Sequence, residues 1–223
     1  MAQYSASSEE NWDIIDHSSS SVIVPACRYC IDRSSSSLEE QYAACRCLEA
    51  LCIMLGSNRD EHYESVEGTL RRTVMATDRV PQVRSAALRA LCLTSFICCS
   101  GNLVDEQSTG LLLDFCESLC REYWRGDEEV LTPPKLRAAA LSCWALLSTL
   151  VDDPLISGEG DADIGRGLTM LPVLLECLEH DNFDLRFAAG ECVALIHESR
   201  LSLGISNEAA ENASERRYRH GKL

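Results

Sequence analysis

Apolar residues recur along most of the chain at intervals of three and four, which is the period of an amphipathic α-helix. The stretch that begins at Leu136 shows this well, because Trp144 and Leu147 fall on the same helical stripe. Small residues let two helix axes approach closely. Small residues that recur at the same point of several such stretches are therefore predicted to lie in the core. Trp144 is also predicted to lie in the core. Four stretches align without gaps on a pair of adjacent alanines: Ala43 and Ala44, Ala86 and Ala87, Ala139 and Ala140, Ala188 and Ala189.

The alanine pairs are separated by 43, 53 and 49 residues. Armadillo and HEAT repeats are about 40 to 47 residues long, so the two longer intervals indicate inserted loops. A second apolar helix is predicted before each pair, at 22–31, 65–77, 108–124 and 167–179, with Pro172 in the first turn of the last one. The pattern predicts an all-α, armadillo/HEAT-like solenoid of about four repeats.

Three segments fall outside this periodic pattern or interrupt it. Residues 1–21 are rich in serine and acidic residues and are predicted to be disordered. Residues 22–204 form the predicted repeat domain, which a Gly- and Asp-rich loop interrupts at 152–167. Residues 205–223 form a polar tail. Proline or Asp/Asn at 78–81, 132–134 and 181–184 marks the expected helix starts.

The distribution of charge separates the tail from the rest of the chain. The formal net charge is −15, so the body of the protein should repel nucleic-acid phosphates. Four basic residues nevertheless fall in the last eight positions: Arg216, Arg217, Arg219 and Lys222. They are the candidate partner-binding residues. The sequence leaves open whether this tail is simply solvated or contacts RNA or an acidic partner.

The chain contains thirteen cysteines, an odd number, and most of them lie within apolar helical patterns. Buried thiols in a reducing compartment explain this better than disulfides do. There is no secretory signal, and no apolar run reaches the roughly 18 to 20 residues that a membrane span needs. We therefore expect a cytoplasmic or nuclear protein, or one found in both compartments, with no membrane association.

No motif in the sequence strongly indicates catalysis or metal binding. Cys27, Cys30, Cys45 and Cys47 approach zinc-site spacing, but Cys45 and Cys47 on one helix would point about 200° apart. The five histidines are scattered and form no catalytic set. Repeated arginines precede three alanine pairs, at Arg84, Arg137 and Arg186. These arginines either form a ladder that binds an acidic partner or pair with acidic or carbonyl groups of the preceding turn. We predict no catalytic, cofactor-binding or metal site and no small-molecule substrate.

Three stretches carry a resemblance to a known family: Leu48–Gly56, Ala139–Leu147 and, above all, Asp184–Ile196. The region from Ser37 to Gly204 resembles the N-terminal domain of the interferon-related developmental regulator family. Its Arg-x-Ala-Ala-Gly-Glu-x-Leu-Ala-Leu-Leu block appears here with Val193 and Ile196 as apolar replacements. Compared with that family, we expect a shortened N-terminus and no separate C-terminal domain, because the chain stops within a basic stretch.

The resemblance implies an armadillo-like fold and a transcriptional co-regulator that bridges partner proteins. For one branch of the family it implies association with translationally idle ribosomes. We therefore expect a non-enzymatic protein-interaction scaffold. The alternative is a ribosome- or RNA-associated translation regulator that uses the basic tail.

Overall fold

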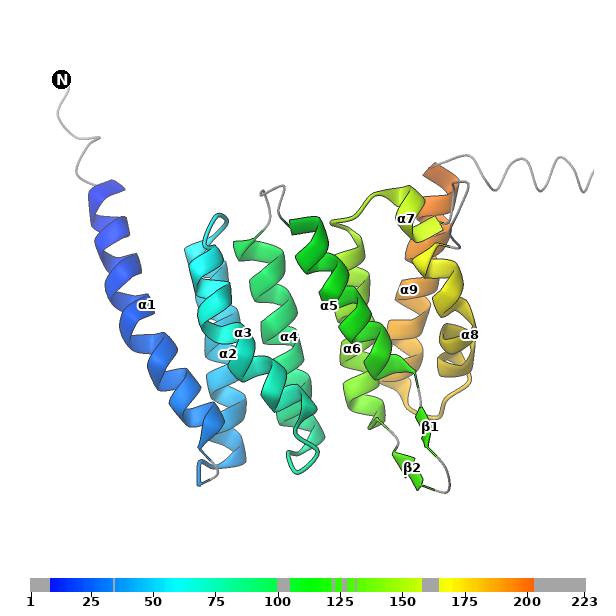
Figure 1. Cartoon of the computed structure of the whole chain (residues 1–223), viewed down its shortest axis with the longest axis horizontal. Helices are drawn as coiled ribbons and strands as arrows, with labels where there is room; N and C mark the ends of the chain where they lie inside the picture. Colours follow the sequence, from blue (N-terminus) through cyan, green and yellow to red (C-terminus); the bar gives the residue numbers. More distant parts are fainter. Residues whose placement is uncertain are drawn as a thin grey trace, which may run out of the picture. The chain divides into compact units, whose positions relative to one another are not determined.

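The computed structural model describes residues 9–33, 35–99, 105–121, 123–125, 128–130, 132–157 and 165–202, and most of them are helical (Figure 1). The chain divides into two compact units, Met1–Leu112 and Leu113–Leu223. The helices are α1 (Glu9–Asp32), α2 (Leu38–Leu55), α3 (Asp60–Met75), α4 (Pro81–Cys98), α5 (Asp105–Cys120), α6 (Pro134–Ser148), α7 (Asp153–Ser157), α8 (Arg166–Leu178) and α9 (Phe183–Ser202). Strands β1 (Tyr123–Arg125) and β2 (Glu128–Val130) pair in antiparallel orientation.

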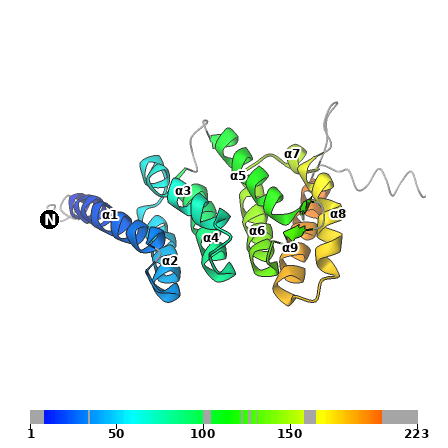
Figure 2. The same ribbon diagram turned by 60° about the horizontal axis from the view of Figure 1, so that its bottom comes forward.

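In the first unit, α4 packs against both α2 and α3, and α1 packs against α2 and α3. Figure 2 shows α2 and α4 beside each other, with α3 on the opposite layer. Leu48 of α2, Leu70 of α3 and Leu91 of α4 are fully buried between these helices. The two helices that carry alanine pairs are therefore direct neighbours.

The second unit repeats this arrangement. Helix α9 packs against α6 and α8, and the short α7 packs against α8 and α9. Trp144 of α6, Leu174 of α8 and Ala189 of α9 have no exposed surface. We call the helices that carry alanine pairs inner helices and the apolar helices that precede them outer helices. In both units an inner helix packs against another inner helix and against the outer helix that precedes it, which is the packing of an all-α solenoid. The number of repeats in the chain stays a prediction.

The predicted start signals lie at real helix starts. Helix α4 begins at Pro81 and α6 at Pro134, where a proline costs no helical hydrogen bond. Helix α2 begins with a capping box, in which the Ser37 hydroxyl accepts from the Glu40 amide and the Glu40 carboxylate accepts from the Ser37 amide. Local sequence therefore sets the boundaries of the inner helices.

Two prolines lie inside helices, Pro172 deeper in its helix than the sequence suggested. Pro172 was expected in a first turn, but α8 begins at Arg166 and places it in the helix interior. Pro25 likewise lies inside α1, which begins at Glu9 and so includes part of the segment predicted to be disordered. Both prolines are on exposed faces, where water can hydrate the carbonyl group that loses its N–H partner.

Two further elements differ from expectation. The helix predicted over 108–124 is α5, which ends at Cys120, and β1 follows at Tyr123. The loop predicted over 152–167 contains the five residues of α7. Both differences lie in polar connecting segments, where periodicity carries little information. The predicted tail, 205–223, lies outside the described residues.

Most of the paired alanines lie in the core, together with Trp144. In the first unit Ala44 is buried on α2, and Ala86 and Ala87 have no exposed surface on α4. The second unit buries both of its pairs, with Ala139 at the limit of burial. The seven buried members are Ala44, Ala86, Ala87, Ala139, Ala140, Ala188 and Ala189.

Ala43 is the exception among the paired alanines, because its side chain is exposed beside the exposed Tyr42 and Arg46. Its neighbour Ala44 is buried, so the pair on α2 is split between the core and the solvent. Its aligned partner Ala86 is buried on α4, which packs against α2. The prediction of a core position was wrong for this one alanine.

All thirteen cysteines are thiols rather than disulfides, and eleven are buried, Cys30 and Cys47 being half-buried. Burial raises the pKa of Cys45 and of Cys98 to about 12, so both stay protonated at neutral pH. Burial, with a smaller contribution from Cys47, also raises the pKa of Cys27 to about 12. Protonated thiols are poor nucleophiles and poor metal ligands. No group of three or more potential ligands is arranged to hold a metal ion within the described ranges.

None of the helices that the structure describes combines the length and the apolar character needed to cross a membrane.

Candidate partner-binding surfaces

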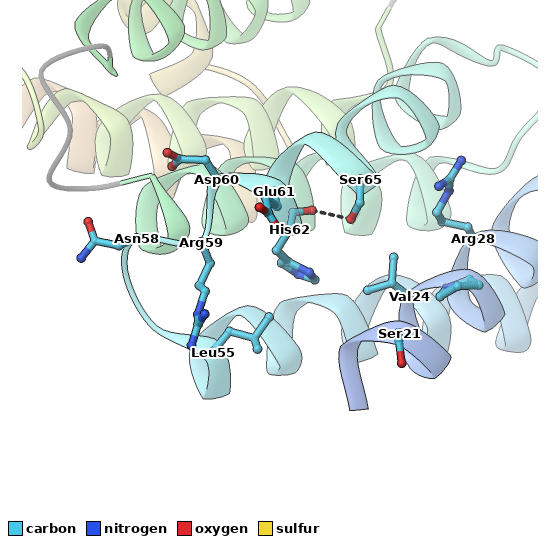
Figure 3. A pocket seen from close by; sticks show the side chains of 11 residues that line it. Ser21, Val24, Arg28, Leu55, Asn58, Arg59, Asp60, Glu61, His62 and Ser65 are labelled. Atoms are coloured by element: carbon cyan, nitrogen blue, oxygen red, sulfur yellow. Dashed lines mark hydrogen bonds between the residues drawn. The ribbon is translucent and has the colours of Figure 1, made fainter. Parts of the chain in front are cut away.

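A cavity of about 560 Å³ opens in the first unit between α1, the α2–α3 connection and the start of α3 (Figure 3). It is lined by Ser21, Val24, Pro25, Arg28, Leu55, Asn58, Arg59, Asp60, Glu61, His62 and Ser65. The connection is shaped by left-handed backbone conformations at Gly56 (φ 74°) and Asn58 (φ 60°). The Arg59 amide donates to the Cys98 carbonyl and fastens the connection to α4.

His62 is the most unusual side chain in this cavity. It is 6% exposed, and neither ring nitrogen has a hydrogen-bond partner. Burial lowers the pKa of His62, because the charged imidazolium would lose its hydration. The Ser65 hydroxyl donates to the His62 carbonyl, at 2.6 Å, and not to the imidazole (Figure 3). The pair therefore lacks the geometry of an activated serine nucleophile.

We expect His62 to make the stability of the protein depend on pH. Below about pH 6.5 the unfolded chain binds a proton on this histidine. The folded chain resists that proton because its pKa is lowered. The free energy of unfolding should therefore fall as the pH drops below about 6.5, and the loss should be absent at higher pH. Urea unfolding followed by circular dichroism between pH 7.5 and 5.5 measures this slope.

The variant His62→Gln should flatten the slope. His197→Gln is the matched control, because His197 is an exposed histidine of the second unit. An unchanged slope in His62→Gln would show that His62 is not the responsible group.

The repeated arginines hold helix ends. Arg84 Nε donates to the Val74 carbonyl at 2.7 Å, in the last turn of α3. Arg186 Nη1 donates to the carbonyls of His180 and Asp181, just after α8. Free carbonyls at a helix C-terminus carry partial negative charge, which a guanidinium stabilises. The structural interpretation therefore holds for both arginines.

Two other residues occupy the same aligned position. Arg137 is buried and reaches the last turn of α8, with Nη2 3.3 Å from Cys177 Sγ and 3.9 Å from a Glu176 carboxylate oxygen. In the first aligned stretch the residue is Gln41, whose amide donates to the Ser36 carbonyl at 3.2 Å. Gln41 was not grouped with the repeated arginines, because glutamine carries no charge. Its side-chain amide nevertheless donates to a backbone carbonyl, as Arg84 and Arg186 do.

A buried polar network joins three elements of the second unit. Glu117 of α5 accepts a hydrogen bond from Trp144 Nε1 at 3.1 Å and from Arg166 Nη1 at 3.0 Å. Arg166 also bonds Asp114 at 2.7 Å. The Arg166 guanidinium neutralises the buried carboxylate and the Trp144 indole hydrogen-bonds to it, so packing within the second unit explains this network.

Among the described residues of the second unit, the most exposed large apolar side chain lies on α9. Phe183 is 67% exposed and Phe187 58% exposed, and their rings stack with centroids 6.2 Å apart. Ala194 and Leu201 are also exposed. Positions 187, 194 and 201 are seven residues apart, so they fall on one stripe of the helix. We name these four residues the α9 face.

A row of carboxylates runs beside the α9 face. Asp184, Glu191 and Glu198 are all exposed and are also seven residues apart. They form a second stripe parallel to the first, displaced by about one eighth of a turn. On the other side of the face lies α8, since a side chain at Gly190 would come 3.9 Å from Leu178. The surface is thus apolar and edged by negative charge.

The predicted binding residues are different residues from those of the α9 face. Arg216, Arg217, Arg219 and Lys222 lie outside the described residues. Phe183 and Phe187 are not among the predicted binding residues, because residues 181–184 carry the signal of a helix start and Asp184–Ile196 has the pattern of a core helix. The available signal was a pair of phenylalanines at i and i+4, on the side of the helix opposite Ala188.

Comparison with known proteins agrees with the resemblance in the sequence. Residues 13–221 match the family model described as Interferon-related developmental regulator (IFRD). A curated relative, interferon-related developmental regulator 2 of Mus musculus, is 30% identical over 169 residues, which are 72% of this chain and 35% of the relative. The chain therefore spans about a third of that relative's length. No solved structure matches. The chain belongs to the interferon-related developmental regulator family.

Proposed function

We propose that the protein is a non-enzymatic adaptor that acts as a transcriptional co-regulator by docking a partner protein on the α9 face. The observation that carries this proposal is the exposed aromatic stack of Phe183 and Phe187. An apolar surface of this kind costs free energy in water, and aromatic residues dominate the energetics of protein interfaces. Buried thiols fit the reducing environment of the cytoplasm and nucleus.

The test is affinity purification of the tagged chain from cells, with quantitative mass spectrometry of the proteins that copurify. The double variant Phe183→Ala/Phe187→Ala should lower the recovery of a direct partner about tenfold or more. An interface residue of this kind contributes about 2 kcal/mol, and 1.4 kcal/mol corresponds to a factor of ten.

The matched control is Tyr42→Ala, which removes an exposed aromatic ring from α2. It should leave the partner profile unchanged, and thermal melts should show that both variants fold. Identical partner profiles for wild type and the phenylalanine double variant would contradict docking on the α9 face.

A second candidate is association with ribosomes or RNA through the basic tail. The supporting observation is that Arg216, Arg217, Arg219 and Lys222 are concentrated in the last eight positions of an otherwise acidic chain. The same purification distinguishes the two functions. Ribosomal proteins that are lost at higher salt, and in a chain without residues 214–223, would favour the RNA interpretation, because phosphate contacts depend strongly on salt.

A further inference from the structure

The α9 face lies on the side of α9 that is opposite to its contact with α6. On the contact side, Cys192 Sγ donates a hydrogen bond to the Leu141 carbonyl of α6 at 3.3 Å. Ala194 follows two residues later and therefore lies about 200° around the helix from Cys192. A helix placed along the α9 face would continue the packing of helix against helix that joins α6 to α9 within the second unit. The fold therefore favours a helix as the occupant of this face.

The side chains of the α9 face also have the spacing that helix pairing uses. Phe187, Ala194 and Leu201 repeat every seven residues, as apolar residues do along the seam of a coiled coil. Phe183 precedes Phe187 by four residues, which is the spacing between the two seam positions of a heptad. Between the bulky ends lie the half-buried Gly190 and the exposed Ala194, whose small size lets another helix approach closely. The face is about 27 Å long, which matches a helix of about 18 residues.

The carboxylate row beside the face, Asp184, Glu191 and Glu198, favours a basic helix. Its members are exposed, repeat every seven residues and flank the apolar seam. Among the side chains that the structure describes, none forms a salt bridge with these three carboxylates. The row therefore attracts lysine and arginine side chains, whereas it repels acidic helices and nucleic-acid phosphates.

We propose, on the basis of the adaptor function proposed above, that the segment docking on the α9 face is a basic amphipathic helix of a partner protein. Its apolar side chains pack against Phe187 and Leu201, and its lysine or arginine side chains lie beside the carboxylate row. Docking through the aromatic stack does not by itself require a basic partner, so the carboxylate row adds a selection for charge.

A second copy of this chain is a weaker candidate for the occupant. A symmetric contact through the α9 face would bring together two surfaces that are both edged by carboxylates. Each chain also carries a formal net charge of −15. Like charges that face each other across an interface lower its stability, and a basic helix avoids this cost.

A synthetic peptide of defined pattern tests the proposal on the full chain. The probe carries a fluorescent label and has three heptads, with leucine at both seam positions and lysine at both flanking positions. The lysines repel one another, which keeps the peptide from pairing with itself. Fluorescence anisotropy should show saturable binding that weakens as salt is added. A peptide that stays unbound at about 100 μM protein would overturn the proposal.

The same peptide with glutamate in place of every lysine separates recognition of charge from docking of apolar side chains. It presents the same leucines but should not bind, because its carboxylates would face Asp184, Glu191 and Glu198. Equal binding of the two peptides would show that the face does not select a basic helix.

Two triple variants of equal charge test the position of the site. Asp184→Asn/Glu191→Gln/Glu198→Gln should weaken binding of the lysine peptide about tenfold, because three ion pairs are lost. The matched control, Glu39→Gln/Glu64→Gln/Asp78→Asn, removes three exposed carboxylates from the first unit and should weaken binding by about twofold at most. Equal losses in the two variants would mean that the peptide responds to the net charge of the chain, which would overturn the proposal.

Affinity purification with the same variants distinguishes failure of this proposal from failure of the adaptor function. Partners that are lost from Phe183→Ala/Phe187→Ala but retained by the carboxylate variant would leave docking on the α9 face intact and overturn its selection of a basic helix. Partners retained by both variants would contradict the adaptor function as well. Sedimentation velocity covers the remaining occupant, because a dimer that the phenylalanine variant dissociates would assign the face to a second copy.

Discussion

Replacement of Ala140 by arginine is expected to lower the free energy of unfolding by about 3 kcal/mol or more. Ala140 has no exposed surface and lies on α6, the helix that packs against α9. A longer side chain there must either push these helices apart or bury a guanidinium without a partner. Urea unfolding followed by circular dichroism at 222 nm gives the change directly.

The aligned alanines supply the comparison. Ala188→Arg on α9 should be about as destabilising, because Ala188 is only 2% exposed. Ala43→Arg should change stability by less than about 0.5 kcal/mol, since Ala43 faces solvent. An equal loss in Ala43→Arg and Ala140→Arg would mean that the effect comes from helix composition and not from packing between inner helices.

Trp144→Ala is expected to cost about 3 to 5 kcal/mol, because a buried indole leaves a large cavity. The same change removes the hydrogen bond that Nε1 donates to Glu117. Glu117 keeps Arg166 as a partner, so the carboxylate is not left uncompensated. Calorimetric melting should show the loss as a large drop in the melting temperature.

Trp144→Phe keeps one aromatic ring in the core. It removes the N–H donor and the volume of the second ring, so its cost should be smaller than that of Trp144→Ala, about 2 kcal/mol. Equal costs for the phenylalanine and alanine variants would mean that the retained ring contributes nothing, which contradicts the packing argument.

The inner helices were predictable because their signals are local and repeated. Pro81 and Pro134 each favour the first turn of a helix, and the structure places both at helix starts. The second alanine of every pair, including Ala44 and Ala87, is buried as the alignment predicts. Family membership was likewise carried by a contiguous block, Asp184–Ile196, which forms most of α9.

Other features depend on neighbours that periodicity does not reveal. Ala43 matches Ala86 in the alignment, but its side chain is exposed whereas that of Ala86 is buried. Pro172 resembles a first-turn proline, but its position depends on where the preceding loop ends. Phe187 resembles a core residue and lies on the uncovered side of α9. Similarly, the partners of Glu117 come from other elements, so its role required the fold.

The buried thiols affect whether unfolding of the protein is reversible. In the native state burial keeps Cys45 and Cys98 protonated, with pKa values of about 12. Unfolding returns all thirteen cysteines to water, where the ordinary thiol pKa of about 8.5 produces reactive thiolate. Oxidation and mispairing then compete with refolding in air. Heat inactivation without a reductant should therefore be irreversible, and its midpoint should depend on the scan rate.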